Sequence, residues 1–178
     1  MAQNSVPKLS TSSLVLVLAL AIIFLAQAKE LTETQMSLYL QDIAAGPNAT
    51  LTPIAGIAGK LWTFTQFGTV YVTDDPITET PDPNSALIGR LQGIYVASGL
   101  QGRNTYASVS IVFTSKEYNG STLELQGNSQ QFEQVREISV VSGTGKFRFA
   151  RGYATFETYF LDQPNAYSIL RCNVTVLH

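Results

Sequence analysis

Short runs of alternating apolar and polar residues fill most of this chain, and they restrict its fold more than any other feature. Alternation with a period of two, in runs rich in β-branched and aromatic residues, predicts β-strands with one buried face. Only residues 31–37 suggest a helix, and that piece merges into the first run. The predicted strands span residues 36–43, 67–73, 91–97, 106–113, 121–126, 135–141, 152–161 and 167–177. About eight strands without crossover helices predict an all-β, antiparallel domain.

Turn-forming residues separate these runs. Asn119-Gly120 lies between two alternating runs and is the strongest hairpin signal. Residues 142–145 and 162–165 mark further turns, and we expect Asp74-Asp75-Pro76 to end a strand as a turn before a loop over residues 81–85. Eight antiparallel strands that must hide their edges favour a closed barrel or a sandwich. An eight-stranded barrel can enclose side chains or one small ligand.

The first 28 residues carry the three parts of a secretory leader. Residues 1–11 are polar with one cation, Lys8, residues 14–25 are apolar, and Ala26-Gln27-Ala28 supplies the small-x-small pattern that signal peptidase cleaves. The alternative is a membrane anchor, but the apolar run is shorter than the ~20 residues that span a bilayer. We therefore expect residues 1–28 to be a signal peptide, residues 29–178 to form one secreted, extracellular domain, and no membrane partner to remain after cleavage.

Three asparagines stand in N-x-[ST] sequons, the acceptor pattern for N-glycosylation: Asn48, Asn119 and Asn173. One sequon is weak evidence, but three sequons behind a secretory leader support one another. We expect all three asparagines to face solvent and the mature chain to be a glycoprotein.

Cys172 is the only cysteine, so no intrachain disulfide can form. Alternation places it on one strand face with Leu170, Val174 and Val176, which favours a buried thiol that packs as a small hydrophobe. A nucleophilic cysteine needs a base nearby, and the only histidine is the terminal His178. An intermolecular disulfide stays open as an alternative.

Composition excludes several classes of function. The net charge of −2 provides no basic face, so we expect no nucleic-acid partner. One cysteine and one terminal histidine cannot build a usual zinc or copper site or a Ser-His-acid triad. Residues 143–145 lie between strands and lack the ending of a phosphate-binding loop. We therefore expect no metal, no cofactor and no oxidative centre of the chain's own.

Three residues remain as candidates for chemistry: Asp42, Tyr95 and Arg136. Asp42 is in register with Leu38 and Leu40 on an apolar face, where a carboxylate must be paired or become neutral, unless the strand ends there and Asp42 caps the next turn. Arg136 would be a natural partner for Asp42 if it points inward, and an ordinary surface arginine if it does not. Tyr95 lies between small residues at positions 93 and 97, which leaves room for a ligand, although tyrosine also simply fills strands.

Several longer motifs, taken in order, resemble those of the plant dirigent family. They are Tyr39–Ile43 (YLQDI), Gly68–Pro76 (GTVYVTDDP), Ile88–Tyr95 (IGRLQGIY), Val135–Ile138 (VREI), Val141–Ala154 (VSGTGKFRFARGYA) and Cys172–His178 (CNVTVLH). The resemblance covers essentially the whole mature region. It implies an eight-stranded antiparallel barrel of the allene-oxide-cyclase-like (calycin-like) type, usually a homotrimer, secreted to the plant cell wall, the apoplast.

The resemblance also implies an activity. Dirigent proteins bind small phenoxy radicals of the monolignol type, which a separate laccase or peroxidase generates, and they control the regio- and stereoselective coupling of these radicals in phenylpropanoid and lignan biosynthesis. They perform no oxidation themselves. Within the family pattern, Asp42, Tyr95 and Arg136 fall on cavity-lining positions, where they would orient a radical or quinone methide or transfer protons.

Two departures from the family pattern bear on function. Ser129 stands where lignan-forming members resemble one another in having an aspartate, and the early cysteine that pairs with the late one in some members is missing. The chain is therefore similar to the broader dirigent-like branch, in which some members are enzymes that close a heterocycle by losing water through a quinone methide.

Three functions follow from these features. They are a stereo-guide for radical coupling, which is not an enzyme in the oxidative sense, a dehydrating cyclase acting on an isoflavonoid-like alcohol, and a cell-wall defence protein that binds phenolics or glycans.

Overall fold

The computed structural model describes residues 10–27 and 31–178, and it divides the chain into two units, Met1–Leu31 and Thr32–His178. The first unit contains helix α1, Thr11–Gln27, which includes the whole apolar stretch of the predicted leader, residues 14–25. No helix among the described residues is long and apolar enough to span a bilayer. The predicted cleavage site ends at Ala28, which lies outside the described residues.

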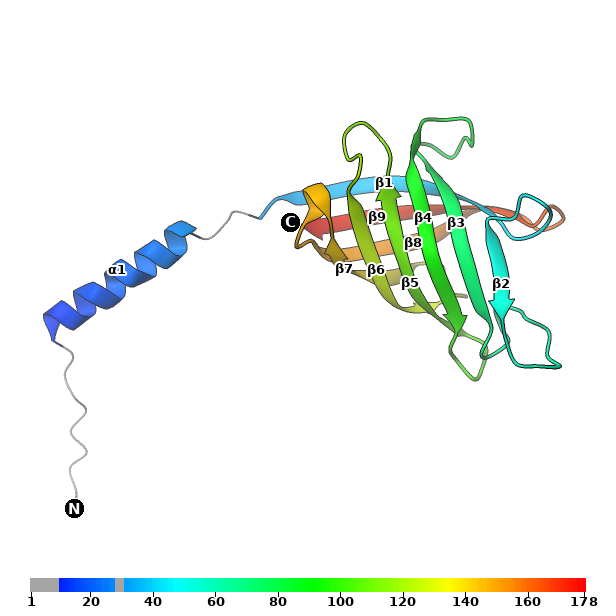
Figure 1. Cartoon of the computed structure of the whole chain (residues 1–178), viewed down its shortest axis with the longest axis horizontal. Coiled ribbons are helices and arrows are strands. Elements are labelled where there is room, and N and C mark those ends of the chain that lie inside the picture. The colour runs from blue at the N-terminus through cyan, green and yellow to red at the C-terminus, as the bar shows by residue number, and fades with distance from the viewer. Residues whose placement is uncertain (1–9, 28–30) are drawn as a thin grey trace, which may run out of the picture. The chain divides into compact units, whose positions relative to one another are not determined.

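The second unit is a closed antiparallel barrel (Figure 1). Its strands are β1 (Glu33–Ile43), β2 (Leu51–Ala55), β3 (Val70–Thr78), β4 (Leu87–Ala97), β5 (Asn104–Phe113), β6 (Thr122–Gln130), β7 (Arg136–Gly143), β8 (Arg151–Asp162) and β9 (Tyr167–Leu177). They pair in the order β1-β9-β8-β7-β6-β5-β4-β3-β2, and β1 also pairs with β3. That last pairing closes an eight-stranded barrel and leaves β2 as an additional strand on β3. The predicted eight-stranded barrel is confirmed, and the sandwich is not formed.

The seam of the barrel lies along β3. Strand β2 pairs with the first part of β3, through residues 70–73, whereas β1 pairs with it only at its end, Tyr39 with Thr78 and Leu40 with Ile77. Between these two pairings, β3 carries Asp75 and Pro76. Pro76 has no N–H to donate, and at this position the N–H would point between the end of the β2 pairing and the start of the β1 pairing. A proline therefore costs no strand-to-strand hydrogen bond there.

The sequence prediction is wrong at three places near this seam. Asp74-Asp75-Pro76 is not a turn, because β3 continues through it with inward side chains at positions 71, 73, 75 and 77. Residues 31–37 form no helix, because β1 begins at Glu33 and pairs with β9 along its full length. Strand β2 was not anticipated, since Pro53 and the turn residues before it resemble a loop.

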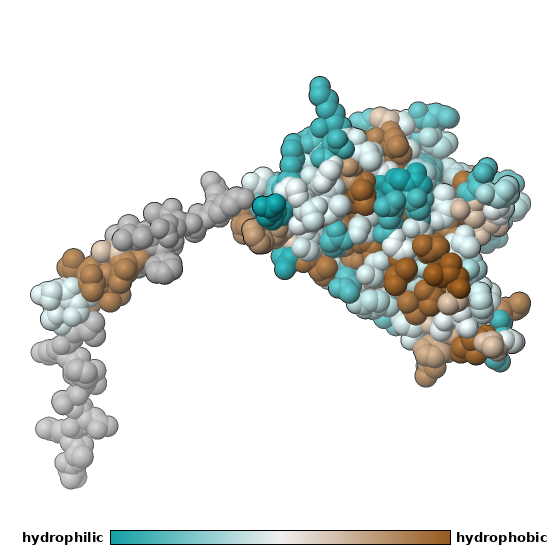
Figure 2. Space-filling model, in the orientation of Figure 1, coloured by the Kyte–Doolittle hydropathy of each residue, from teal (hydrophilic) through white to brown (hydrophobic). Residues whose placement is uncertain are grey.

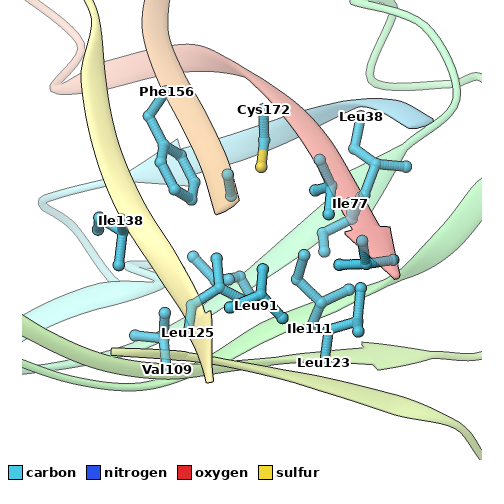
Figure 3. Packing of buried hydrophobic residues seen from close by; sticks show 14 of the residues in the cluster. Leu38, Ile77, Leu91, Val109, Ile111, Leu123, Leu125, Ile138, Phe156 and Cys172 are labelled. Atoms are coloured by element: carbon cyan, nitrogen blue, oxygen red, sulfur yellow. The ribbon is translucent and has the colours of Figure 1, made fainter. Parts of the chain in front are cut away.

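One end of the barrel is packed solid. We call the end where β1 begins and β9 ends the closed end, and the opposite end the open end. At the closed end the 3-10 helix η1, Gly145–Phe147, inserts Phe147, which is fully buried. Its ring centroid lies 5.3 Å from that of Phe113, 5.0 Å from that of Tyr118 and 5.1 Å from that of His178. Next to this aromatic cluster, aliphatic side chains from all eight strands interdigitate (Figure 3).

Cys172 lies within that core (Figure 3), where it is fully buried. Val174 and Val176 are buried on the same strand face, as predicted. Burial raises the pKa of its thiol far above the ordinary value, which disfavours the reactive thiolate. Of the three sequon asparagines, Asn48 and Asn119 are exposed, whereas Asn173 is half-buried and accepts a hydrogen bond from the Ser37 hydroxyl (2.8 Å). Glycosylation of the three sites stays a prediction.

Candidate functional site

A cavity of about 340 Å³ opens inside the barrel at its open end. Most of its wall is apolar, and a few polar side chains converge in it, which is the usual composition of a small-molecule site. The lining residues are Asp42, Leu51, Phe64, Asp75, Tyr95, Thr105, Ser129, Gln131, Phe132, Arg136, Ile138, Phe156, Thr158, Leu161, Ser168 and Leu170. The three candidates from the sequence, Asp42, Tyr95 and Arg136, are therefore in one cavity.

Asp42 lies near the end of β1, where the inward row Leu38, Leu40, Asp42 changes from aliphatic to acidic. The pKa of Asp42 is raised from 3.8 to about 7. Burial is the largest cause and the negative charge of Asp75 the second, whereas a hydrogen bond from Ser168 opposes the rise. That bond is long, 3.4 Å between Ser168 Oγ and Asp42 Oδ2, and Oδ1 has no partner. Near neutral pH, Asp42 therefore exists as a mixture of carboxylic acid and carboxylate, which suits a group that transfers protons.

Asp75 is the site residue that the sequence prediction missed. Asp75 lies on the inward face of β3, two residues before Ile77, and it lines the same cavity as Asp42. Its carboxylate is buried and accepts a hydrogen bond from Thr73 Oγ1 (2.8 Å). Burial raises its pKa above the ordinary value, although the side chains of Thr50 and Thr73 oppose this rise as hydrogen-bond donors. The negative charge of Asp75 contributes to the raised pKa of Asp42, so the two carboxyl groups are favoured when they hold one proton between them.

The signal for Asp75 was present in the sequence. Tyr71, Thr73, Asp75 and Ile77 alternate with exposed or half-buried neighbours, as a strand requires. Aspartate before proline outweighed that alternation, because the Asp-Pro pair is a common turn former. Asp74, one residue earlier, points outward and pairs with Arg90 and Gln92 on the surface.

Arg136 enters the cavity from β7, but it does not pair with Asp42. Its Nε donates to the Phe156 carbonyl (3.4 Å) and its Nη2 to Thr158 Oγ1 (3.2 Å), both on β8. The ion pairs among the described residues are Arg90–Asp74 and Arg171–Glu157, so the expected Asp42–Arg136 pair is wrong. The strand order explains this result, because β7 is separated from β1 by β8 and β9. A cation and an acid thus face the cavity from different walls, with room for a guest between them.

Tyr95 extends inward from β4, between those two walls. Burial raises the pKa of its phenol well above the ordinary value, the charges of Asp75 and Asp42 add to the rise, and Arg136 lowers it. Tyr95 is therefore a protonated phenol that can donate or accept a hydrogen bond. Gly93, two residues before Tyr95, allows the backbone of β5 to approach β4 closely, since a Cβ there would lie 2.3 Å from the Ser108 carbonyl oxygen. It therefore does not serve to make room for a ligand.

Aromatic rings cover the outer part of the cavity. Phe156 comes from β8, but Phe64 and Phe132 come from loops, which carry no periodic pattern and so gave no signal in the sequence. Ser129 also lines the cavity. At the position where the lignan-forming pattern has an aspartate, the cavity wall therefore has a serine. Among residues 10–27 and 31–178, no three His, Cys, Asp or Glu side chains gather closely enough to hold a metal ion.

Comparison with known proteins gives a consistent result. The sequence model described as "Dirigent-like protein" matches residues 33–177. Dirigent protein 1 of Arabidopsis thaliana is 36% identical over 145 residues, which are 82% of this chain and 79% of that protein. Pterocarpan synthase 1 of Glycyrrhiza echinata is 37% identical over 146 residues, 82% and 78% of the two chains. The solved structure of the pterocarpan synthase dirigent protein GePTS1 superimposes with a TM-score of 0.76 at 35% identity and covers 85% of this chain and 88% of its own.

Proposed function

Because this chain belongs to the dirigent family, we propose that it controls how a phenolic intermediate closes a new bond and that it performs no oxidation itself. The proposed reaction is the dehydrating cyclisation of an isoflavonoid-like alcohol through a quinone methide. The observation that carries the proposal is the burial of two carboxyl groups, Asp42 and Asp75, in one mostly apolar cavity. This burial raises the pKa of Asp42 to about 7, so a proton is available there near neutral pH. The relatives and the solved structure named pterocarpan synthase support the same choice.

The proposed reaction balances without an oxidant. Asp42 gives its proton to the benzylic hydroxyl, the benzylic C–O bond breaks and water leaves. The phenol conjugated to that carbon releases its proton to Asp75, so a neutral quinone methide forms. A second phenolic hydroxyl of the same molecule then bonds to the carbon and gives its proton to Asp42, while the quinone-methide oxygen recovers a proton from Asp75. The net change is the loss of one water.

The other polar residues would orient the guest and stabilise its charge. Arg136 lines another wall of the cavity, where its cation can stabilise negative charge that develops on the second phenolic hydroxyl as it attacks. Tyr95 can hydrogen-bond that hydroxyl or the oxygen of the quinone methide. Because only one face of the quinone methide would be open to the second hydroxyl, a rigid cavity gives one stereochemical product.

The test is turnover in the absence of any oxidant. The purified protein is incubated with an isoflavan-4-ol that carries hydroxyls at positions 7 and 2′, and the products are separated by chiral chromatography. We expect one enantiomer of the closed ether at a rate well above the spontaneous reaction. The uncatalysed rate at saturating protein, or a racemic product, would contradict the proposal.

Stereoselective coupling of monolignol-type phenoxy radicals is the second candidate. The three phenylalanine rings of the cavity, Phe64, Phe132 and Phe156, favour it, because they offer faces on which two phenols can stack. The cavity volume, near the lower end of the range for ligand sites, and Ser129 in place of an acid favour a single guest instead. Coniferyl alcohol with an added laccase distinguishes the two, since an optically enriched dimer supports coupling and a racemate excludes it. A wall protein that only binds phenolics or glycans is left if ligand binds and neither reaction responds.

The proposal includes secretion to the cell wall and assembly as a homotrimer. Support for assembly comes from the outer faces of β3 and β4, where the cross-strand neighbours Val72 and Ile94 are exposed. Figure 2 shows hydrophobic surface over these strands. Light scattering of the protein and of Val72→Lys tests this part, with the trimer expected to dissociate in the variant.

A further inference from the structure

Three loops meet at the mouth of the cavity. They connect β2 to β3 (residues 56–69), β4 to β5 (residues 98–103) and β6 to β7 (residues 131–135). The first loop carries Phe64 and the third carries Phe132, and both rings line the cavity. Whatever fixes these loops therefore fixes the outer wall of the site.

The side-chain amide of Gln131 joins all three loops. Its Nε2 donates one hydrogen bond to the carbonyl of Phe64 and one to the carbonyl of Gly102, each 3.0 Å long. An amide nitrogen has two hydrogens, so both are used, each on a different loop. The backbone N–H of Gln131 adds a bond to the Arg103 carbonyl (3.2 Å).

The loop that carries Phe64 is also held from the barrel side. The ring of Phe64 stacks on that of Tyr71 in β3, with centroids 4.0 Å apart and planes 2° from parallel. The hydroxyl of Tyr71 donates to the Trp62 carbonyl (3.2 Å). Gly102, with φ +69°, allows the second loop to approach, since a Cβ there would lie 2.5 Å from the carbonyl oxygen of Thr65. Phe64 is thus held from two sides, by the ring of Tyr71 on β3 and by the hydrogen bond from Gln131 to its carbonyl.

We propose that Gln131 is a positioning residue that holds Phe64 over the mouth of the cavity, and that this clamp selects phenolics of two or more fused or linked rings over single-ring phenols. The selection rests on the proposed function, because it assumes that the polar groups of the cavity anchor one phenol. The anchors Asp42, Asp75 and Tyr95 are on strands, whereas Phe64 is on a loop at the mouth. Under this proposal, a single-ring guest at the anchors contacts the strand residues alone, whereas a longer guest also contacts Phe64.

Gln131→Met tests this proposal, because methionine keeps the length of the side chain and removes both donors. Gln66→Met is the matched control: the amide of Gln66 lies in the same loop as Phe64, but it donates only to the carbonyl of the next residue, Phe67 (3.2 Å). Two probes that cannot be dehydrated by the proposed route are compared by calorimetric titration, the flavanone naringenin and the single-ring phenol guaiacol.

We expect Gln131→Met to bind naringenin about tenfold more weakly and guaiacol within twofold of wild type, with Gln66→Met unchanged for both. The ratio of the two affinities is a readout that a merely structural role would not move, because partial unfolding weakens both probes alike. An unchanged ratio in Gln131→Met, or an equal loss for both probes, would overturn the proposal.

A second measurement separates this proposal from the proposed function. The chain has one tryptophan, Trp62, two residues before Phe64. Without any ligand, we expect acrylamide to quench Trp62 fluorescence at least twice as efficiently in Gln131→Met as in Gln66→Met. Equal quenching would overturn the clamp. Quenching could increase in Gln131→Met while wild type binds neither probe. That result would contradict both the proposed function and the selection of longer phenolics, but it would support the positioning of the loop by Gln131.

Discussion

The two ends of the barrel are built by the same strands, but their inward side chains differ. Along β1 the inward row changes from Leu40 to Asp42, along β7 from Ile138 to Arg136, and along β3 from Ile77 to Asp75. At the closed end, Phe147 and its aromatic neighbours exclude any guest. At the open end, polar groups border a cavity that no side chain of the barrel fills.

This difference separates stability from chemistry within one small fold. Burial of aliphatic and aromatic groups stabilises a domain in proportion to the surface removed from water, and the closed end provides most of it here. The open end carries two acids whose pKa values burial raises, which destabilises the folded state whenever both are charged. We infer that the stability provided by the closed end offsets the destabilisation caused by the buried acids at the open end. Four predictions test this comparison of the two ends.

The largest expected effect is at the closed end. Phe147→Ala should lower the free energy of unfolding by about 3–5 kcal/mol, because it leaves a cavity under η1. Urea unfolding followed by circular dichroism measures it. Phe149→Ala is the control, since Phe149 is 79% exposed and should change stability by no more than about 0.5 kcal/mol. Similar losses in both variants would contradict a closed end that carries the stability.

At the open end, Asp42→Asn should reduce the rate of oxidant-free cyclisation at least hundredfold, because an amide cannot give its proton to the leaving hydroxyl. The melting temperature should not fall. Asp74→Asn is the matched control, with its carboxylate on the outer surface beside Arg90, and it should keep the rate within twofold. A variant Asp42→Asn that retains full turnover would exclude Asp42 as the acid.

Stability should depend on pH through the same residue. The folded pKa of Asp42, about 7, lies above its unfolded value near 3.8, so between these values only the folded state keeps the proton. The stabilisation is complete below about pH 4 and is lost as the pH rises through 7. From pH 5 to 8 we expect wild type to lose about 2 kcal/mol, less than the full shift implies because water enters the cavity, and Asp42→Asn to lose about half of that or less. Parallel curves for the two proteins would contradict this assignment.

The smallest of the four effects is expected at Arg136. Lysine keeps the charge of this residue but loses the fork that reaches both the Phe156 carbonyl and the Thr158 hydroxyl. Arg136→Lys should reduce kcat/KM about tenfold with an unchanged pH optimum, as measured by initial rates from pH 5 to 9. A shifted optimum would mean that Arg136, and not only Asp75, sets the protonation of the acid.

The closed end could be predicted from the sequence better than the open end. Alternation in β5 and in the second half of β9, with turn residues at strand ends, predicts an all-β barrel or sandwich with Cys172 buried. The resemblance to the dirigent family favours the barrel. Asp42 could be identified because it continues an apolar row, which is an unusual place for a carboxylate.

What could not be predicted depends on contacts between distant segments. Asp75 was interpreted as a turn former because the Asp-Pro pair is a local turn signal. The sequence does not show that the partner of β3 changes from β2 to β1 near this position, which is what allows a proline within the strand. Phe64, Gln131 and Phe132 lie on loops, where no periodicity relates a residue to the cavity. The Asp42–Arg136 pair was expected because both residues point inward, but only the strand order shows that they face the cavity from different walls.

The central claim is that burial against the apolar wall, together with the negative charge of Asp75, raises the pKa of Asp42 to about 7. Carbon-13 NMR of the labelled aspartate side chains, titrated in wild type and in Asp75→Asn, tests it most directly. The account predicts that Asp42 titrates near pH 7 in wild type and at a clearly lower pH in Asp75→Asn, with Asp74→Asn unchanged. An Asp42 carboxyl that titrates near pH 4 in wild type, or does not respond to the loss of Asp75, would contradict it.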